Sequence, residues 1–416
     1  MRFEVPYSKD LIDSIKFMNT LTFNSKYHAL LIFVNTEDNE VTFQVDDESN
    51  NEIMGKTGFK YTIYVSDMKE DIEKKKVAVI CNDFYQIIKD IKSDFIFETN
   101  FVHATITTVG DYPHTYSLNY SFNAAEKREL LNTDIDLDKL NPIIVKGDIF
   151  KSAIKKTREF TLGGGIYEGQ KSPMLFIKLA VNTDSYLEWF SINGYQCAKF
   201  IDTSKTVEKI QLPKDGIFIP GLICKSLESW IKPKNDISIV YNKDYVIINQ
   251  HTKSSITNSL ILSVSRKWAE DYPNIDKLLE TELDSKVNIW SFRRTILDTL
   301  KILKRRRVES IILSTKIVKD EIEAKTYPVL NIRTDDGSTN MDFPIINTIY
   351  YYEGKDIQDT IVKVTNILDN VESLGREVIM FNWLEPLKPI FLREYNDDNS
   401  LNKYNYVNVC MPIKEV

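Results

Sequence analysis

Residues 142–158 read PIIVKGDIFKSAIKKTR. The first four residues form an apolar run of the length that makes a short strand in a protein interior. After them, Ile149, Phe150, Ala153 and Ile154 recur at the spacing that places side chains on one face of a helix. The stretch therefore predicts a short strand that leads directly into an amphipathic helix.

The same order, a short strand, a helix and then two or more strands, recurs along the chain, and we count six such units. The first helix begins near Ser8, whose hydroxyl can cap the free amides of the first turn. The sixth helix is predicted to carry Ile357, Ile361, Val364 and Leu368 on one face. The opening strands are predicted at residues 2–5, 77–80, 142–145, 216–219, 287–290 and 349–352. Later strands include residues 29–35, 61–65, 115–122, 174–181, 186–192, 196–201, 340–344 and 406–413.

Two polar, acidic stretches, residues 124–140 and 278–285, divide the 416 residues into three parts of similar length. Linkers between domains have this composition, because few of their side chains can join a core. Each part then contains two of the six units. We therefore predict an α+β protein of three similar domains, residues 1–135, 136–282 and 283–416.

The composition is that of a globular protein, with 43% hydrophobic and 27% charged residues. No run approaches the ~20 apolar residues of a membrane span, and residues 1–10 lack the pattern of a secretion signal. The cysteines are widely separated and form no Cys-x-x-Cys pair, which favours free thiols in a reducing compartment. We therefore expect a cytoplasmic protein with no membrane partner and with Cys81, Cys197, Cys224 and Cys410 unpaired.

No group of residues in the sequence indicates catalysis. The glycines at 163–165 lack the Gly-Lys-Ser/Thr that completes a phosphate-binding loop. Acidic pairs at 46–47, 335–336 and 397–398 lie in polar, turn-like stretches, where carboxylates are usually solvated. Four histidines stand alone, without the spacing of metal ligands: His28, His103, His114 and His251. We expect no metal, no cofactor and no enzymatic activity.

The formal net charge of −7 argues against general adhesion to nucleic acid, but the basic residues are concentrated in the helices of the third and fifth units. They are Lys146, Lys151, Lys155, Lys156 and Arg158 in the third, and Arg293, Arg294, Lys301, Lys304, Arg305, Arg306 and Arg307 in the fifth. Only Asp148 and Asp298 oppose them within these stretches.

A row of positive charge on a helix requires a negative partner, and the phosphate backbone of DNA is one such partner. A solvated face is the alternative for either helix alone, but two basic helices at matching places favour a shared function. Neither helix carries the polar residues of a recognition helix. We therefore expect binding to double-stranded DNA without sequence preference.

Four segments resemble one known family. Residues 1–5 read MRFEV and precede a helix; residues 173–176 (PMLF) and 189–198 (WFSINGYQCA) resemble a strand pair ending in Thr-Asp-Gly-His/Tyr-Arg-Leu-Ala. Residues 271–275 (DYPNI) are similar to Phe-Pro-Asp-Tyr, and residues 409–414 (VCMPIK) to a terminal Val-Met-Pro-Met-Arg. The family is the bacterial DNA polymerase III beta subunit, the beta sliding clamp, which this chain resembles as a divergent member.

The resemblance implies a DNA clamp fold, with helices lining a ring and sheets outside, and a head-to-tail homodimer that encircles duplex DNA and confers processivity on a replicative polymerase. It also implies a pocket that receives short linear peptides of DNA polymerase, clamp loader and repair proteins. By position, the pocket wall is Ile192, Gly194, Tyr195, Gln196, Cys197, Pro273, Lys277, Leu278, Val409, Met411, Pro412 and Ile413. The dimer seam is assigned in the same way to Tyr116, Leu118 and Ile302.

The chain departs from the family pattern at the pocket. The family's Arg-Leu is Gln196-Cys197 here, its threonine is Ile192, and two residues follow Lys414. These differences predict altered partner preference, as in a phage, plasmid or paralogous clamp. The alternative is a non-enzymatic scaffold of repeated α+β units whose basic helices bind an acidic protein. A nuclease that depends on Mg²⁺ and Asp335 is a third, more distant hypothesis.

Overall fold

The computed structural model forms two compact units. Unit 1 comprises Met1–Ser152 and Val207–Lys267, and unit 2 comprises Ala153–Thr206 and Trp268–Val416. The structure describes residues 1–21, 29–46, 57–69, 76–100, 103–126, 129–130, 142–162, 172–207, 212–213, 215–241, 245–263, 271–274, 279, 287–319, 326–345, 359–383, 387–394 and 406–413. The boundaries of the three domains drawn from the sequence stay a prediction.

Within the described residues, a strand leads into a helix in each of the six predicted units, so the repeated order of elements is confirmed. The helices are α1 (Lys9–Thr20), α2 (Cys81–Ile88), α4 (Gly147–Thr157), α5 (Gly221–Trp230), α7 (Arg293–Arg305) and α8 (Val364–Ser373). As predicted, Ser8 caps α1, because its Oγ accepts a hydrogen bond from the backbone N of Asp10 at 3.2 Å. A short helix, α3 (Phe122–Glu126), and two 3-10 turns, Arg158–Phe160 and Pro173–Leu175, were not predicted.

Unit 1 contains two antiparallel sheets. The first has the strand order β5 (Ser66–Lys69), β1 (Arg2–Val5), β7 (Phe95–Thr99), β8 (Ala104–Thr108) and β9 (Thr115–Leu118). The second has the order β10 (Tyr120–Ser121), β6 (Lys76–Ile80), β2 (Ala29–Asn35), β3 (Glu40–Asp46), β4 (Thr57–Tyr64), β18 (Thr257–Ser263), β17 (Tyr245–Gln250), β16 (Asp236–Tyr241) and β11 (Ile143–Lys146). The pairing of β4 with β18 makes one sheet from strands about 200 residues apart, with Thr62 opposite Thr257. The strand β15 (Ile217–Pro220) leads into α5.

Unit 2 also contains antiparallel strands in two sheets. One has the order β12 (Phe176–Val181), β13 (Tyr186–Ile192), β14 (Gln196–Thr206), β26 (Tyr406–Cys410), β25 (Ile390–Glu394), β24 (Val378–Trp383) and β19 (Val287–Phe292). The other has the order β22 (Asn340–Pro344), β21 (Thr326–Arg333), β20 (Ser310–Lys319) and β23 (Thr360–Lys363). Since β14 pairs with β26, Cys197 lies opposite Val409 and the last described strand of the chain is held beside the middle of the sequence.

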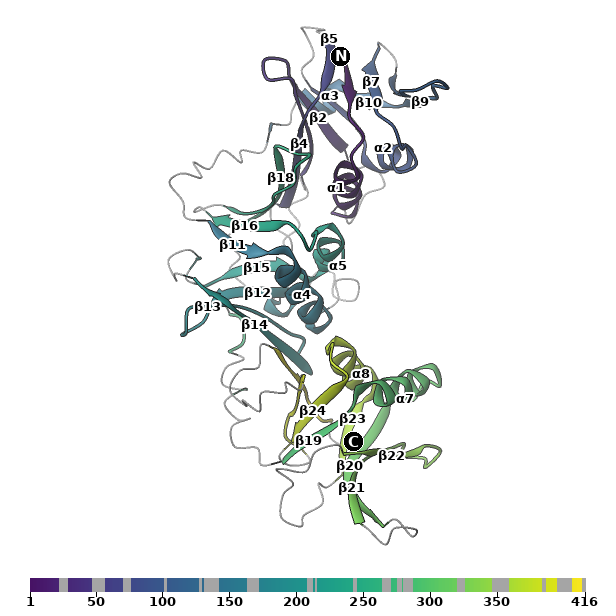
Figure 1. Cartoon of the computed structure of the whole chain (residues 1–416), viewed down its shortest axis with the longest axis vertical. Helices are drawn as coiled ribbons and strands as arrows, with labels where there is room; N and C mark the ends of the chain where they lie inside the picture. Colours follow the sequence, from purple (N-terminus) through teal and green to yellow (C-terminus); the bar gives the residue numbers. More distant parts are fainter. Residues whose placement is uncertain are drawn as a thin grey trace. The chain divides into compact units, whose positions relative to one another are not determined.

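Helices in each unit pack together beside the strands (Figure 1). In unit 1, α1 packs against α2 and α5, and the ring of Phe17 stacks on that of Trp230 with centroids 5.3 Å apart. In unit 2, α7 packs against α8. The apolar helix faces are buried as the periodicity predicted, and each fully buried large side chain contributes about 1.5–3 kcal/mol.

A close backbone approach fixes the junction between β11 and α4. The backbone N of Gly147 donates to the carbonyl oxygen of Asn235 at 2.9 Å. A Cβ at Gly147 would lie 2.5 Å from that oxygen and closer still to the carbonyl oxygen of Lys232. Only glycine fits here, which is why the strand can lead directly into the basic helix.

Several predictions of element type were wrong; among them, the strand predicted at 174–181 begins in the 3-10 turn Pro173–Leu175. Ile361 was predicted on the sixth helix, but it lies in β23, and α8 begins at Val364. The β-branched run Thr360-Ile361-Val362 favours a strand, and pairing with β20 satisfies its backbone. The strand predicted at 115–122 is divided between β9, β10 and α3. The strand predicted at 349–352 lies outside the described residues.

Candidate functional site: basic helices and an apolar cluster

The basic residues in α4 and directly next to it have different surroundings. Lys146 and Lys155 are exposed. Lys151 donates from Nζ to the carbonyl oxygen of Ile231 at 3.4 Å, and Arg158 forms an ion pair with Glu159 at 2.8 Å. Lys146 and Lys151 belong to unit 1, and Lys155 and Arg158 to unit 2. An anion can therefore reach Lys146 and Lys155 without displacing a partner within the described part of the chain.

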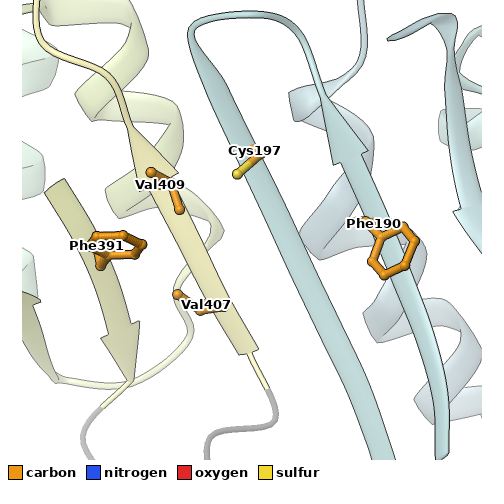
Figure 2. Packing of buried hydrophobic residues seen from close by; sticks show 5 residues of the cluster. All are labelled: Phe190, Cys197, Phe391, Val407 and Val409. Carbon is orange, nitrogen blue, oxygen red and sulfur yellow. The ribbon is translucent and has the colours of Figure 1, made fainter. Parts of the chain in front are cut away.

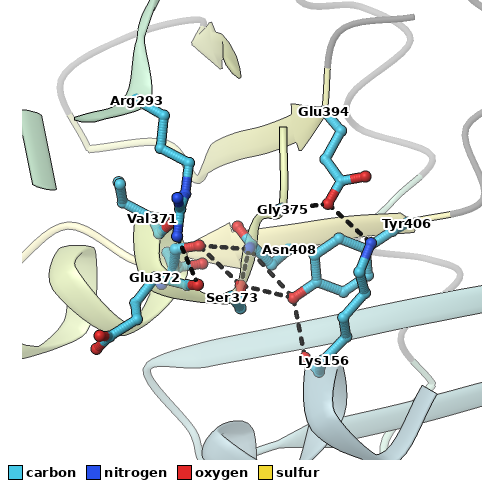
Figure 3. A network of polar contacts seen from close by, with 10 residues as sticks. Lys156, Arg293, Val371, Glu372, Ser373, Gly375, Glu394, Tyr406 and Asn408 are labelled. Carbon is cyan, nitrogen blue, oxygen red and sulfur yellow. Dashed lines mark hydrogen bonds and ion pairs between the residues drawn. The ribbon is translucent and has the colours of Figure 1, made fainter. Parts of the chain in front are cut away.

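Lys156 is held inside unit 2. Its Nζ lies 2.8 Å from Oε1 of Glu394, and the two side chains are only 16% and 17% exposed. The same ammonium lies 4.5 Å from the centroid of the Tyr406 ring. Figure 3 shows this pair beside a network in which the hydroxyl of Tyr406 donates to the carbonyl oxygen of Lys156 at 2.9 Å. The charge of Lys156 is thus neutralised by the protein.

The same network continues to α8 (Figure 3). Nδ2 of Asn408 donates to the carbonyl oxygen of Asn370 at 2.9 Å and to Oγ of Ser373 at 2.8 Å. Arg293, another predicted DNA contact, donates to the carbonyl oxygens of Val371 at 2.9 Å and Glu372 at 3.0 Å. Arg293 therefore satisfies the last turn of α8, where the helix leaves carbonyl groups unpaired.

The basic residues of α7 that form no ion pair within the described residues lie near the two ends of the helix. Arg294, Lys304 and Arg305 are exposed and form no ion pair within the described residues. Lys301 pairs with Glu372 at 3.1 Å, which leaves both side chains largely in solvent. Arg306 is exposed and donates to the hydroxyls of Thr339 and Ser338 at 3.1 and 3.2 Å.

The turn 193–195 between β13 and β14 is fixed by side chains. Oδ1 of Asn193 accepts from the backbone N of Tyr195 at 3.1 Å and of Gln196 at 2.9 Å. Gly194 has φ +88°, a conformation that glycine adopts without strain. Nε2 of Gln196 donates to the carbonyl oxygen of Asn366 at 2.6 Å, so this side chain anchors the turn to α8. Tyr195 is left exposed at the surface.

A hydrophobic cluster lies behind this turn. Its buried members are Phe190, Cys197, Phe391, Val407 and Val409, which come from β13, β14, β25 and β26 (Figure 2). Ile192, Met411, Tyr272, Leu279 and Ala180 pack against it and are partly buried. Burial raises the pKa of the Cys197 thiol to about 12, so the thiol stays neutral and packs as a small apolar group.

The structure thus brings four residues of the expected pocket wall together: Ile192, Cys197, Val409 and Met411. The backbone N of Met411 also donates to the carbonyl oxygen of Tyr195 at 2.8 Å. Four more residues of the expected wall are close to these in the sequence and are partly or fully exposed: Gly194, Pro273, Pro412 and Ile413. Lys277 and Leu278 lie outside the described residues.

Six members of the cluster were not in the predicted wall: Phe190, Phe391, Val407, Tyr272, Leu279 and Ala180. The hydroxyl of Tyr272 lies 3.1 Å from the carbonyl oxygens of both Phe176 and Phe190. The family resemblance includes the segment that contains Tyr272. It does not predict which carbonyl oxygens the hydroxyl of Tyr272 contacts. The sequence indicates only that Phe391 belongs to a strand. The pairing of β25 with β26, which the sequence does not show, places its side chain in the cluster.

The residues assigned to the dimer seam divide into exposed and buried ones. Tyr116 is 41% exposed on β9, the terminal strand of its sheet, and Ile302 is 53% exposed on α7. Leu118 is only 4% exposed and belongs to the core of unit 1. Met341, which the sequence did not single out, is exposed on the terminal strand β22.

Among the described residues, no helix combines the length and apolar composition needed to cross a membrane. No three His, Cys, Asp or Glu residues in this part of the chain gather where they could hold a metal ion. The four cysteines are buried and unpaired, as the sequence predicted.

The whole chain is similar to solved structures of bacterial sliding clamps. Three of these are the DNA polymerase III subunit beta of Pseudomonas aeruginosa (12% identity, TM-score 0.73), that of Thermotoga maritima (13%, 0.74) and the DNA polymerase sliding clamp of Bacillus subtilis (16%, 0.72). In each comparison, 100% of both chains is covered. No family model matches the sequence, and no curated protein matches it. The chain therefore has the α+β fold of these clamps over its full length, which confirms the predicted fold class.

Proposed function

We propose that this chain is a DNA sliding clamp: a homodimer that closes head to tail around duplex DNA and confers processivity on a replicative DNA polymerase. The main support is the clamp fold over the full length of the chain. In this proposal the protein works in the cytoplasm as a non-catalytic accessory subunit of DNA polymerase III. Its helices line the ring and its sheets form the outer wall.

The DNA contacts in this proposal are the exposed cations of α4 and α7. Lys155, Arg294, Lys304 and Arg305 have no ion-pair partner within the described residues, and Lys146 extends the set from unit 1. Contacts of lysine and arginine with phosphates release counterions and carry no sequence information. Such contacts hold DNA weakly, so a closed ring can slide along it. Lys151, Arg158, Lys301 and Arg306 are secondary contacts, since each already has a partner in the protein.

The partner site in this proposal is the surface of the hydrophobic cluster beside Tyr195. Ile192 and Met411 are partly exposed there and offer apolar surface to a short linear peptide of a polymerase, a clamp loader or a repair protein. Gln196, which stands where the family has arginine, is engaged with Asn366 and is not free to bind a peptide. Partner selection at this chain therefore depends on apolar shape more than on a charged group at that position.

The test is retention on closed DNA. The full-length protein is loaded with a clamp loader onto nicked circular DNA, purified by gel filtration, and then treated with a restriction enzyme that linearises the circle. We expect the protein to stay with the circle and to leave the linear product, because a ring holds DNA by topology. Equal retention on both forms, or binding to acidic protein but not to DNA, would overturn the proposal.

A further inference from the structure

We propose that a hollow between α1 and α5 in unit 1 holds one phosphate group of the DNA backbone. This inference rests on the proposed clamp function, but it uses two helices that carry no basic run in the sequence. The hollow has a volume of about 210 Å³. Its rim includes Lys16 from α1 and Lys225 from α5.

The two lysines provide positive charge that the protein does not use. Both side chains are exposed, and neither forms an ion pair or hydrogen bond within the described residues. They come from different helices and converge on the same hollow. Two cations from separate elements repel each other unless an anion lies between them.

Hydroxyl donors stand beside the lysines. Ser226 and Ser229 line the same hollow, and Lys225 and Ser229 are four residues apart on one face of α5. Neither hydroxyl has a partner in the part of the chain that the structure describes. Two ammonium groups and two hydroxyls are the donors that bind phosphate oxygens in protein–DNA contacts.

The floor of the hollow is rigid and apolar. It consists of the stacked rings of Phe17 and Trp230, both buried, and the ring of Phe59 packs edge-on against both. Nε1 of Trp230 donates to Oδ1 of Asn258 at 3.1 Å, which fixes the indole. A floor that excludes water lowers the local dielectric and strengthens the attraction of the lysines for an anion.

Among the described residues that line the hollow, the one carboxylate is that of Asp13. It forms an ion pair with Lys232, which directly follows Ile231 at the end of α5. The charge of Asp13 is therefore balanced locally, and the charge of Lys16 and Lys225 is left for a ligand.

The size of the hollow favours a small anionic group. Pockets for drug-sized ligands measure about 300–1,000 Å³, and this one is smaller. In unit 1, α1 and α5 lie together beside the strands (Figure 1), and in the clamp proposal the helices line the channel. A phosphodiester of the enclosed duplex is the anion that this position meets.

The experiment measures how DNA binding by the full-length protein depends on salt. Fluorescence anisotropy of a labelled duplex gives the association constant at several chloride concentrations for the wild type, Lys16→Gln, Lys225→Gln and the double variant. Loss of one phosphate contact on a duplex should reduce the slope of log K against log salt by about 0.9. We expect this for the double variant and a weaker affinity for each single one. Lys205→Gln, which removes an exposed lysine from the strand β14, is the matched control and should leave the slope unchanged.

The outcomes separate this inference from the clamp proposal. An unchanged slope in the double variant, with normal binding by the wild type, overturns the phosphate site alone. No binding of the labelled duplex by the wild type at any salt concentration rejects the phosphate site, whereas the clamp proposal is decided by retention on circular DNA. Thermal stabilisation by inorganic phosphate, measured at constant ionic strength, identifies the source of the anion. If the double variant loses this stabilisation but keeps the wild-type slope, the hollow binds free phosphate and the DNA assignment is wrong.

Discussion

Lys155 and Lys156 are neighbours in the sequence, but only Lys155 is free to meet an anion. Lys155→Gln should reduce the salt slope of DNA binding by about 0.9 and leave stability unchanged. Lys156→Gln should do the opposite, because it leaves the poorly exposed carboxylate of Glu394 without its cation. We expect a loss of about 2 kcal/mol in the free energy of unfolding, as for hydrogen bonds to charged groups.

Urea denaturation followed by tryptophan fluorescence, together with anisotropy on a duplex, measures both effects for this pair of variants. Each serves as the control for the other, since the charge change is the same. If Lys156→Gln weakened DNA binding as much as Lys155→Gln without loss of stability, the structural role of Lys156 would be rejected.

At the residue scale, the sequence could predict local geometry but not distant partners. The cap at Ser8 and the inward face of α4 follow from positions a few residues apart. Glu394, in contrast, is 238 residues from Lys156, so periodicity could place Lys156 on the helix surface but could not find its ion pair. The resemblance identified Cys197 and Val409 as neighbours because it carries long-range information that a single sequence lacks.

At the element scale, the predicted strands 29–35, 186–192 and 340–344 have the observed bounds of β2, β13 and β22. Their apolar or alternating patterns end at turn-forming residues, so the sequence indicates where each strand begins and where it ends. The error at Ile361 has a different origin. A short β-branched run next to a helix fits the hydrophobic periodicity of a helix and that of a strand. Only the pairing of β23 with β20 decides between the two.

The packing of α8 near α7 and the end of α4 creates a group that titrates near neutral pH. Burial raises the pKa of Asp369 on α8 from 3.8 to about 6; Lys304 lowers it, and Glu159 and Glu372 raise it further. The folded state therefore binds the proton more tightly than the unfolded state does. The contribution of this carboxyl group to the free energy of unfolding is fully present below about pH 4. It declines by about 1–3 kcal/mol as the pH rises through 6.

Asp369→Asn should remove this decline, because the amide stays neutral throughout. The measurement is the thermal unfolding midpoint of wild type and variant between about pH 4 and 7, the range between the two pKa values with a margin. Asp336→Asn is a control, since Asp336 is exposed and hydrogen bonds from Thr334 and Ser338 lower its pKa to about 2. Parallel pH curves for wild type and Asp369→Asn would show that Asp369 titrates normally.

At the scale of the whole molecule, the sheets cross the domain boundaries drawn from the sequence. Thr257–Ser263 pairs with Thr57–Tyr64, and Tyr406–Cys410 pairs with Gln196–Thr206. Polar linkers mark where a chain passes between cores, but they do not show that strands on either side join edge to edge. Sequence could therefore predict the number of repeated units, whereas the continuity of the sheets required the structure.

The proposed ring needs two seams between copies, and the terminal strands β9 and β22 provide edges for them. Tyr116 is exposed on the first edge, and Met341 and Ile302 are exposed on β22 and α7. Tyr116→Arg places a charge in the seam and should weaken the dimer by about 2 kcal/mol or more, which is roughly 30-fold in the dissociation constant. Size-exclusion chromatography with light scattering should then report monomer at concentrations where the wild type is a dimer.

Tyr112→Arg is the matched control, because Tyr112 is 87% exposed in the loop before β9 and receives the same charge. The seam and the DNA contacts are separate parts of the proposal, and this pair of variants distinguishes them. Tyr116→Arg should lose retention on circular DNA but keep the low-salt affinity for a short duplex, since α4 and α7 are unchanged. A Tyr116→Arg protein that stays dimeric, or a Tyr112→Arg protein that dissociates equally, would place the seam elsewhere on the chain.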